Sequence, residues 1–342
     1  MNRGLQTALR ILISFGLLAL LALLFRRQLG ACITTIRQAD WRYLLLASIT
    51  YLSFILISAW RWQILLRAQQ LHFSIWYLAR VFTIGLFFCK LLPTSIGGDV
   101  MRIAYTTRPG KGPQAFSATF LDRIIGFQSL TLLAIVTGII LSFRQAGALN
   151  LGAGRFTGFS LVLLLAVLLL LLTSITLVFF NDACHRFARR LLDRLRQQIG
   201  ALTRVADIID RAYLSVKNYR HQPAALGISF ISGIGVQAAL ALAWYLTARA
   251  VDARVNIGYY LIFIPMLNIV VNIPTIGGLG VREAAFVLFF TPPWLPNRLT
   301  PERALSTALL FLGLDLLFAI FGGVLFAFTS RASAQPSLVK EE

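Results

Sequence analysis

The apolar residues of this chain gather into runs long enough to cross a lipid bilayer, and this feature constrains the fold most. A helix needs about 20 such residues to cross a hydrocarbon core of ~30 Å, because each residue advances ~1.5 Å. Hydrophobic residues make up 58% of the 342 positions and charged residues only 13%. The sequence therefore predicts an all-α polytopic membrane protein. We predict six full spans, at residues 5–25, 42–60, 120–143, 157–180, 224–247 and 304–328.

The distribution of charge indicates how these spans are oriented. Lys and Arg number 32 against 13 Asp and Glu, a net charge of +19. In a soluble chain this excess would suggest nucleic acid, but between apolar spans it is typical of cytoplasmic loops beside anionic headgroups. We therefore expect a multi-pass protein of the cytoplasmic membrane with residues 61–119, the basic loop 181–222 and both termini in the cytoplasm. The basic loop 26–42 then falls outside, where arginines beside the spans can snorkel.

A short phrase occurs twice, as LPTSIGGD at Leu92–Asp99 and as IPTIGGL at Ile273–Leu279. Each copy follows an apolar run too short to cross the bilayer, and each has two predicted spans before it and one after it. Because three spans separate the copies, they enter the membrane from opposite sides. Paired interrupted segments of this kind are typical of transporters built as inverted-topology repeats around a midplane site.

This pattern divides the chain into two membrane repeats and a tail. The first repeat covers residues 1–150 and contains a re-entrant helical hairpin on the cytoplasmic side, at 81–118. The second covers 151–330 and contains an outer-side hairpin at 257–303. Residues 331–342 form a short cytoplasmic tail.

The tips of the two hairpins are candidate sites for an anion. Proline ends each first half-helix, and the glycine pairs that follow can turn the chain by taking positive φ. The second half-helix then presents free N–H groups and the positive end of its dipole, which suits a phosphate. Lys90, Arg102 and Arg282 stand beside the tips to hold a lipid phosphate, and Asp99 and Glu283 would orient the arginines or bind a cationic headgroup. At the membrane surface the same residues would only snorkel.

Three further ionisable residues fall in predicted spans. Asp315 lies near the middle of the last span, which contains no basic residue to pair with it. Such a carboxylate is a candidate for proton coupling or substrate contact, or alternatively a neutral acid bonded to a neighbouring helix. Asp122 and Arg123, at the start of the third span, form either part of the site or a structural pair.

The remaining features carry less chemistry. The cysteines and histidines are scattered without ligand spacing, so we expect no metal and no cofactor. Residues 182–220 alternate apolar and basic positions at helical spacing. They predict an amphipathic helix that lies on the cytoplasmic leaflet, packs on the protein itself or recruits a cytoplasmic partner.

The segments LPTSIGGDVMR, ATFLDRIIGF and IPTIGGLGVRE resemble the flippase-like membrane domain family, also known as the lysylphosphatidylglycerol synthase transmembrane region. The resemblance covers roughly residues 5–328. Family members are implicated in moving or handling lipids, including aminoacylated phosphatidylglycerol, hopanoids and lipid-linked glycans. The aminoacylating members carry a large soluble synthase domain, so we expect no lysyl-lipid synthesis by this chain alone. The resemblance implies these motif positions: Pro93, Gly97, Gly98, Asp99, Arg102, Asp122, Arg123, Pro274, Gly277, Gly278, Gly280, Arg282 and Glu283.

The sequence thus favours a lipid translocase rather than an enzyme, moving a phosphate-bearing lipid or lipid-linked precursor between leaflets. The chain contains no Walker A phosphate loop, so we expect downhill or ion-coupled movement, with Asp315 or Glu283 carrying the proton. One alternative is a membrane-embedded enzyme with Asp99, Asp122 or Glu283 as acid or base. The other is an accessory subunit that recruits a soluble synthase or glycosyltransferase.

Overall fold

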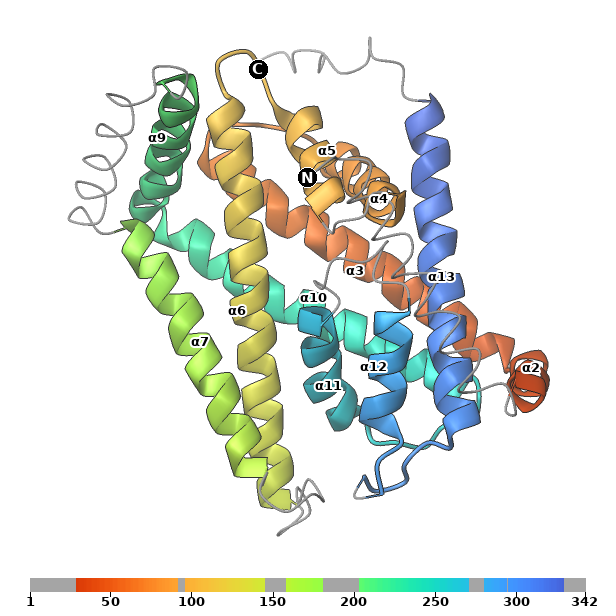
Figure 1. The fold of residues 1–342 in the computed structure, drawn as a ribbon. Coiled ribbons are helices and arrows are strands. Elements are labelled where there is room, and N and C mark those ends of the chain that lie inside the picture. The colour runs from red at the N-terminus through yellow and green to blue at the C-terminus, as the bar shows by residue number, and fades with distance from the viewer. Residues whose placement is uncertain are drawn as a thin grey trace.

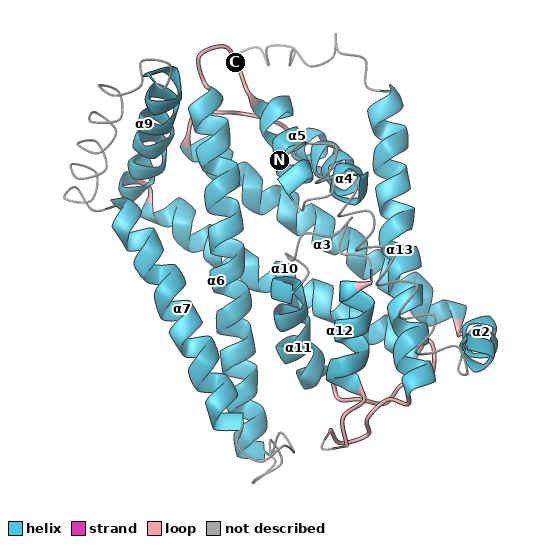
Figure 2. Ribbon diagram, in the orientation of Figure 1, coloured by secondary structure: helices cyan, strands magenta, loops and turns pink. Residues whose placement is uncertain are grey.

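The computed structural model describes residues 29–91, 96–144, 158–180, 203–270, 280–293 and 295–328. Within these ranges the regular secondary structure is entirely helical (Figure 2). The elements in chain order are α2 (Leu29–Arg37), α3 (Trp41–Ala68), α4 (Ile75–Leu91), α5 (Ile96–Thr106), α6 (Gly112–Arg144), α7 (Gly158–Phe180), α9 (Thr203–Lys217), the 3₁₀ helix η2 (Asn218–His221), α10 (Pro223–Arg249), α11 (Ile257–Val270), α12 (Val281–Phe290) and α13 (Pro301–Phe328).

Four described helices are long and apolar enough to cross a membrane, namely α3, α6, α10 and α13. They occupy four of the six predicted spans. The helix α7 occupies a fifth, and its shorter stretch Leu165–Ser174 is apolar; the predicted span 5–25 lies outside the described residues. Large apolar side chains face outward on these helices, with Leu170 67% exposed and Ile231 70% exposed. Such surfaces suit lipid rather than water, as expected for a membrane protein.

Two of the long helices extend well beyond the apolar runs that predicted them. The helix α3 continues to Ala68, and α6 already begins at Gly112. Arg61 was expected in the loop after the second span and Asp122 at the start of the third. Arg61 instead lies inside α3, Asp122 lies ten residues into α6, and both are buried. A run defined by apolar residues ends too early wherever the helix continues through polar, protein-facing positions.

The short helices form two pairs at opposite ends of the molecule. Figure 1 shows α4 and α5 in its upper half and α11 and α12 in its lower half, while α6 and α13 run in opposite directions. The helices α3 and α10 pack on each other along their length, at the centre of the fold. The contacts of one half also recur in the other. The pair α4–α13 corresponds to α11–α6, α5–α6 to α12–α13, α3–α4 to α10–α11, and α3–α6 to α10–α13.

The glycines of the first phrase do not turn the chain, contrary to prediction. Gly97 and Gly98 lie in the first turn of α5. A Cβ on Gly98 would lie 2.7 Å from the backbone oxygen of Gly85 in α4. The glycine therefore permits close contact between the two helices instead of a positive φ. A positive φ is instead found at Gly280, which follows the second phrase directly and precedes α12, at φ 81°.

The described part of the predicted amphipathic segment, α9 and η2, packs on the protein itself. The helix α9 contacts α6 and α7. At its end the Tyr219 hydroxyl donates to the Leu65 carbonyl at 2.7 Å, and the Gln69 amide donates to the Ser215 carbonyl at 2.8 Å. Of the alternatives for residues 182–220, the contacts of residues 203–221 therefore match docking onto neighbouring helices.

Candidate functional site

A first ionic cluster, formed by Arg61, Asp99, Arg102, Asp122 and Arg123, connects α3, α5 and α6. Asp122 lies at its centre and is only 2% exposed. Its Oδ1 accepts a hydrogen bond from Arg61 Nε at 2.7 Å, and its Oδ2 accepts one from Arg102 Nη2 at 2.8 Å. Two cations thus compensate one buried carboxylate, which would be costly to bury alone.

The other end of this cluster is more accessible. Asp99 lies 3.4 Å from Arg102 and 3.2 Å from Arg123, whose side chain is 33% exposed. The Arg102 guanidinium also stands 4.3 Å over the ring of Trp62. These contacts hold Arg102 between a carboxylate on either side and an aromatic face, a desolvated setting that suits guanidinium better than ammonium.

Glycines on two helices make room for Arg61. A Cβ on Gly126 of α6 would lie 3.3 Å from Arg61 Nη2, and one on Gly233 of α10 would lie 3.3 Å from Arg61 Nη1. The Gly233 Cβ would also lie 2.3 Å from Ser129 Oγ. The Arg61 side chain is therefore enclosed where α3, α6 and α10 meet, a location that the sequence analysis missed.

A second ionic cluster, formed by Tyr51, Lys90, Arg282, Glu283 and Asp315, connects α3, α4, α12 and α13. Asp315 is its centre and is buried. The Tyr51 hydroxyl donates to Asp315 Oδ1 at 2.6 Å, and Lys90 Nζ lies 2.6 Å from Oδ2. Arg282 Nη1 donates to the same Oδ2. The last span itself supplies no base, but two cations reach Asp315 from α4 and α12.

Glu283 has a structural role in α12. Its Oε2 accepts a hydrogen bond from the backbone N–H of Gly280, the residue before α12, at 2.7 Å. Its Oε1 accepts from Arg282 Nε and Nη2, each at 3.2 Å. The carboxylate thus satisfies a helix end and fixes the arginine at once. In this arrangement its oxygens are occupied by its own helix.

The two clusters contain the same Arg–Asp pair. Aligning the two phrases on their glycines matches Arg102 with Arg282. Arg102 binds Asp122 in the next long helix, α6, and Arg282 binds Asp315 in the next long helix, α13. The sequence analysis named these four residues without pairing them, and it missed Arg61 and Tyr51. Searching for an acid in the span after each phrase would have found both pairs.

The cations of the two clusters differ in accessibility. Arg61, Arg102 and Arg282 are buried, whereas the side chains of Lys90 and Arg123 are 17% and 33% exposed. Of the predicted phosphate-binding cations, Lys90 is thus the one that an incoming anion reaches first. Arg102 and Arg282 are held by internal carboxylates, so they would bind a phosphate only by exchanging those partners.

Pro93, Pro274, Gly277 and Gly278 lie outside the described residues. In the part of the chain that is described, no three His, Cys, Asp or Glu side chains gather where they could hold a metal ion. The candidate site thus consists of the two ionic clusters.

Comparison with protein families matches residues 7–323 to the family described as the lysylphosphatidylglycerol synthase TM region. No curated protein and no solved structure matches the chain. The matched range includes both phrases and every residue of the two ionic clusters. The chain therefore belongs to the lysylphosphatidylglycerol synthase transmembrane-region family, a family of lipid-related membrane domains.

Proposed function

We propose that this protein is a lipid translocase, which moves a phosphate-bearing lipid or lipid-linked precursor between the leaflets of the cytoplasmic membrane. The observation that carries the proposal is the repeated pair Arg102–Asp122 and Arg282–Asp315. Buried ionisable residues in membrane helices are costly and usually mark a substrate or ion pathway. A pair repeated in the two halves of one fold suits a substrate that is passed from one side to the other.

The arrangement of helices supports an inverted repeat as the basis of movement. The short pairs α4–α5 and α11–α12 lie at opposite ends, and the contacts of one half recur in the other. Opposed repeats of this kind alternate access by rocking around a central site. We infer that α4–α5 and α11–α12 are the two re-entrant hairpins and that each brings the arginine of one Arg–Asp pair to the midplane, where it meets the aspartate of a long helix.

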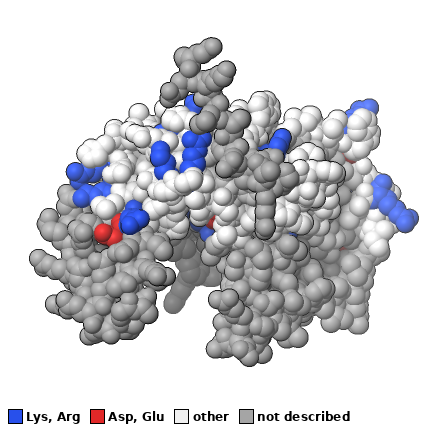
Figure 3. Space-filling view, turned by 90° about the horizontal axis from the view of Figure 1, so that it is seen from above, with Lys and Arg blue, Asp and Glu red and all other residues white. Residues whose placement is uncertain are grey.

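Basic residues at one end of the molecule support the proposed orientation. The loop between α5 and α6 carries Arg108 and Lys111 and lies at the upper end of Figure 1. Figure 3, which looks onto that end, shows Lys and Arg side chains at several places and few Asp or Glu. By the positive-inside rule we place this end, with both termini, in the cytoplasm.

The proposed mechanism is an exchange of ion pairs. The headgroup phosphate first meets Lys90 or Arg123, the more accessible cations, and then replaces Asp122 or Asp315 as partner of the buried arginine. The acyl chains remain in lipid throughout. Asp315, once released from Lys90 and Arg282, is the group that would take up a proton if the movement is ion-coupled.

Reconstitution tests the proposal. The purified protein is reconstituted in liposomes that contain fluorescent phosphatidylglycerol. If it moves lipid, fluorescent lipid from the inner leaflet should reach the outer leaflet, where an impermeant quencher removes its fluorescence. Because removing one partner of a buried pair also costs about 3–5 kcal/mol of stability, Arg102→Lys and Arg282→Lys are the informative variants. They keep the charge but lose the planar fork, and each should slow probe movement about tenfold or more.

The matched control is Arg254→Ala, an exposed arginine in the loop after α10, which should leave movement unchanged. Wild-type rates in both lysine variants would contradict the exchange of ion pairs. A new lipid species detected by mass spectrometry, without movement of the probe, would instead favour a membrane-embedded enzyme. Movement that begins only when a soluble partner is added would favour an accessory subunit.

A further inference from the structure

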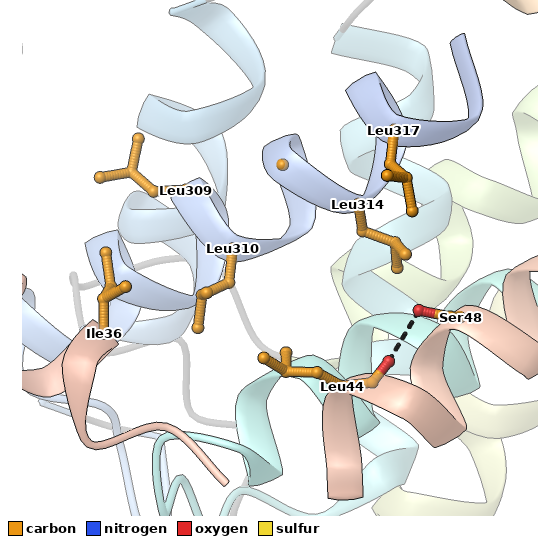
Figure 4. Close-up of a pocket in the computed structure, with 8 residues that line it drawn as sticks. Ile36, Leu44, Ser48, Leu309, Leu310, Leu314 and Leu317 are labelled. Atoms are coloured by element: carbon orange, nitrogen blue, oxygen red, sulfur yellow. Dashed lines mark hydrogen bonds between the residues drawn. The ribbon is translucent and has the colours of Figure 1, made fainter. Parts of the chain in front are cut away.

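An apolar groove opens between α2, α3 and α13, next to the second ionic cluster (Figure 4). Its cavity volume is about 350 Å³. Figure 4 shows Leu310 and Leu314 of α13 pointing toward Leu44 and Ser48 of α3. Among the described lining residues, the one polar side chain is that of Ser48, and its hydroxyl donates to the Leu44 carbonyl at 2.9 Å. The described part of the lining therefore offers mainly apolar contact.

A glycine keeps this groove open. A Cβ on Gly313, two residues before Asp315, would meet nothing within 4 Å. Two residues before Asp122, in the other half, lies Phe120, whose ring stacks on that of Phe116 at 5.9 Å between centroids. The corresponding place in the first half therefore holds aromatic rings.

The groove is adjacent to the second ionic cluster along α3 and α13. Ser48 lies one turn before Tyr51 on α3, and Leu314 directly precedes Asp315 on α13. The hydrogen bond from Tyr51 to Asp315, at 2.6 Å, and the stacking of Tyr51 on Phe318, at 4.9 Å, form the boundary between groove and cluster. Lys90 and Arg282 hold Asp315 from beyond this boundary. Apolar surface and cations are thus adjacent, as an anionic amphiphile requires.

The size of the groove favours a single hydrocarbon chain. One turn of a helix with its side chains fills roughly 400 Å³ or more, given a diameter of at least ~10 Å and a pitch of ~5.4 Å. A further helix would therefore not enter the cavity. A flexible alkyl chain, one carbon wide, can follow its length and bury apolar surface on both sides.

We propose that this groove binds one acyl chain of a membrane phospholipid, with the phosphate directed toward Lys90. The inference rests on the proposed function only in taking this lipid as the cargo, since occupancy of the groove can be measured separately. In the transport reaction, the bound chain would hold the lipid at the α3–α13 boundary. Separation of Tyr51 from Asp315 would then admit its headgroup to the second cluster.

Photo-crosslinking tests occupancy. The full-length protein in nanodiscs receives a trace of phosphatidylglycerol with a diazirine on one acyl chain, and labelled peptides are identified by mass spectrometry. We expect saturable labelling of the peptides that carry Leu44–Ser48 and Leu309–Leu317, in excess over the lipid-facing peptide that carries Ile231. Gly313→Phe, which fills the groove, should reduce the groove labelling at least about fivefold.

Two variants serve as controls. Gly313→Ala adds a methyl group where nothing lies within 4 Å, and Gly227→Phe places the same ring at an equally open glycine of α10. Both should label as the wild type does. Undiminished labelling in Gly313→Phe, or labelling no stronger than that of the Ile231 peptide, would overturn the proposal. So would a cross-link showing that residues 1–28 of the chain occupy the groove instead.

The translocation assay on the same variants separates this proposal from the proposed function. Reduced labelling together with slower movement in Gly313→Phe supports both. Saturable groove labelling without movement in the wild type supports the groove and removes the translocase. Reduced labelling with unchanged movement supports an acyl-chain site but overturns the identification of its lipid as the cargo.

Discussion

The two ionic clusters share an Arg–Asp pair but differ in what else holds the aspartate. Asp122 is completed by Arg61, a buried side chain enclosed by glycines of α6 and α10. Asp315 is completed by Lys90, which is partly exposed, and by the Tyr51 hydroxyl. The buried Arg61 guanidinium cannot leave Asp122 without creating a buried, uncompensated charge. The Lys90 ammonium is partly exposed and lies at the end of a flexible side chain, so it can leave Asp315 more easily.

Within the proposed exchange of ion pairs, we infer that this difference gives the two halves distinct tasks. The first cluster would be the more fixed side, because Arg61, the second cation at Asp122, is buried. The second cluster would open more easily, because Lys90, the second cation at Asp315, is partly exposed. The two halves thus share the same helix contacts but differ in the side chains that hold the aspartate of each Arg–Asp pair.

The largest expected effect compares Arg61 and Lys90, the cations that hold Asp122 and Asp315 in addition to the arginine of each Arg–Asp pair. Arg61→Ala should lower the free energy of unfolding by about 3–5 kcal/mol, because Asp122 loses one of two cations in a buried site. Lys90→Ala should cost clearly less, because Lys90 is partly solvated and Arg282 still holds Asp315. Thermal unfolding in detergent measures both.

Arg67→Ala, on the exposed side of α3 near its C-terminal end, is the matched control and should be neutral within about 0.5 kcal/mol. Equal losses for Arg61→Ala and Lys90→Ala would mean that the two clusters are equally rigid. The assignment of a fixed and an opening side would then fail.

The next effect concerns the contact that brings Lys90 to Asp315. Gly322 of α13 packs against α4 so closely that a Cβ would lie 2.0 Å from the backbone oxygen of Thr83. Gly322→Ala must therefore push the two helices apart, at an expected cost of about 1–3 kcal/mol. Gly227→Ala, at an open position, should show no such loss. If the unfolding temperatures of the Gly322→Ala and Gly227→Ala variants agree, the close contact of α4 with α13 at Gly322 does not contribute to stability.

A smaller effect isolates the hydroxyl at the groove boundary. Tyr51→Phe removes a hydrogen bond to a carboxylate and should cost about 1.5 kcal/mol. Tyr260→Phe is the control, since the buried Tyr260 hydroxyl has no hydrogen-bond partner among the described residues, and its removal should be neutral or stabilising. A neutral Tyr51→Phe would show that Asp315 is held by its cations alone, which would make the boundary easier to open.

Local pattern predicted much of the fold but little of the pairing. Apolar runs predicted the long helices, and the doubled phrase predicted two interrupted regions. The helix ends beyond those runs were not predicted, because Arg61 of α3 and Ser117 of α6 are polar and yet are buried against protein. The partners of Asp315 were also not predicted. Tyr51 is 264 positions away in the sequence, and the periodicity of apolar residues does not indicate such long-range contacts. A residue-by-residue comparison of the two phrases would have found the Arg282–Asp315 pair, but not the contact with Tyr51.

The smallest effect compares one glycine from each half. Gly313→Ala should stabilise the protein by about 0.5–1 kcal/mol, because alanine restricts the unfolded chain and favours helix while its methyl group meets nothing. The same gain should disappear in Gly126→Ala, where the new Cβ would lie 3.3 and 3.4 Å from the two terminal nitrogens of Arg61. That guanidinium is held by Asp122 and has little room to yield. Chemical denaturation of both variants gives the difference directly. Equal stabilisation would mean that Arg61 can move aside, so the first cluster would be no more fixed than the second.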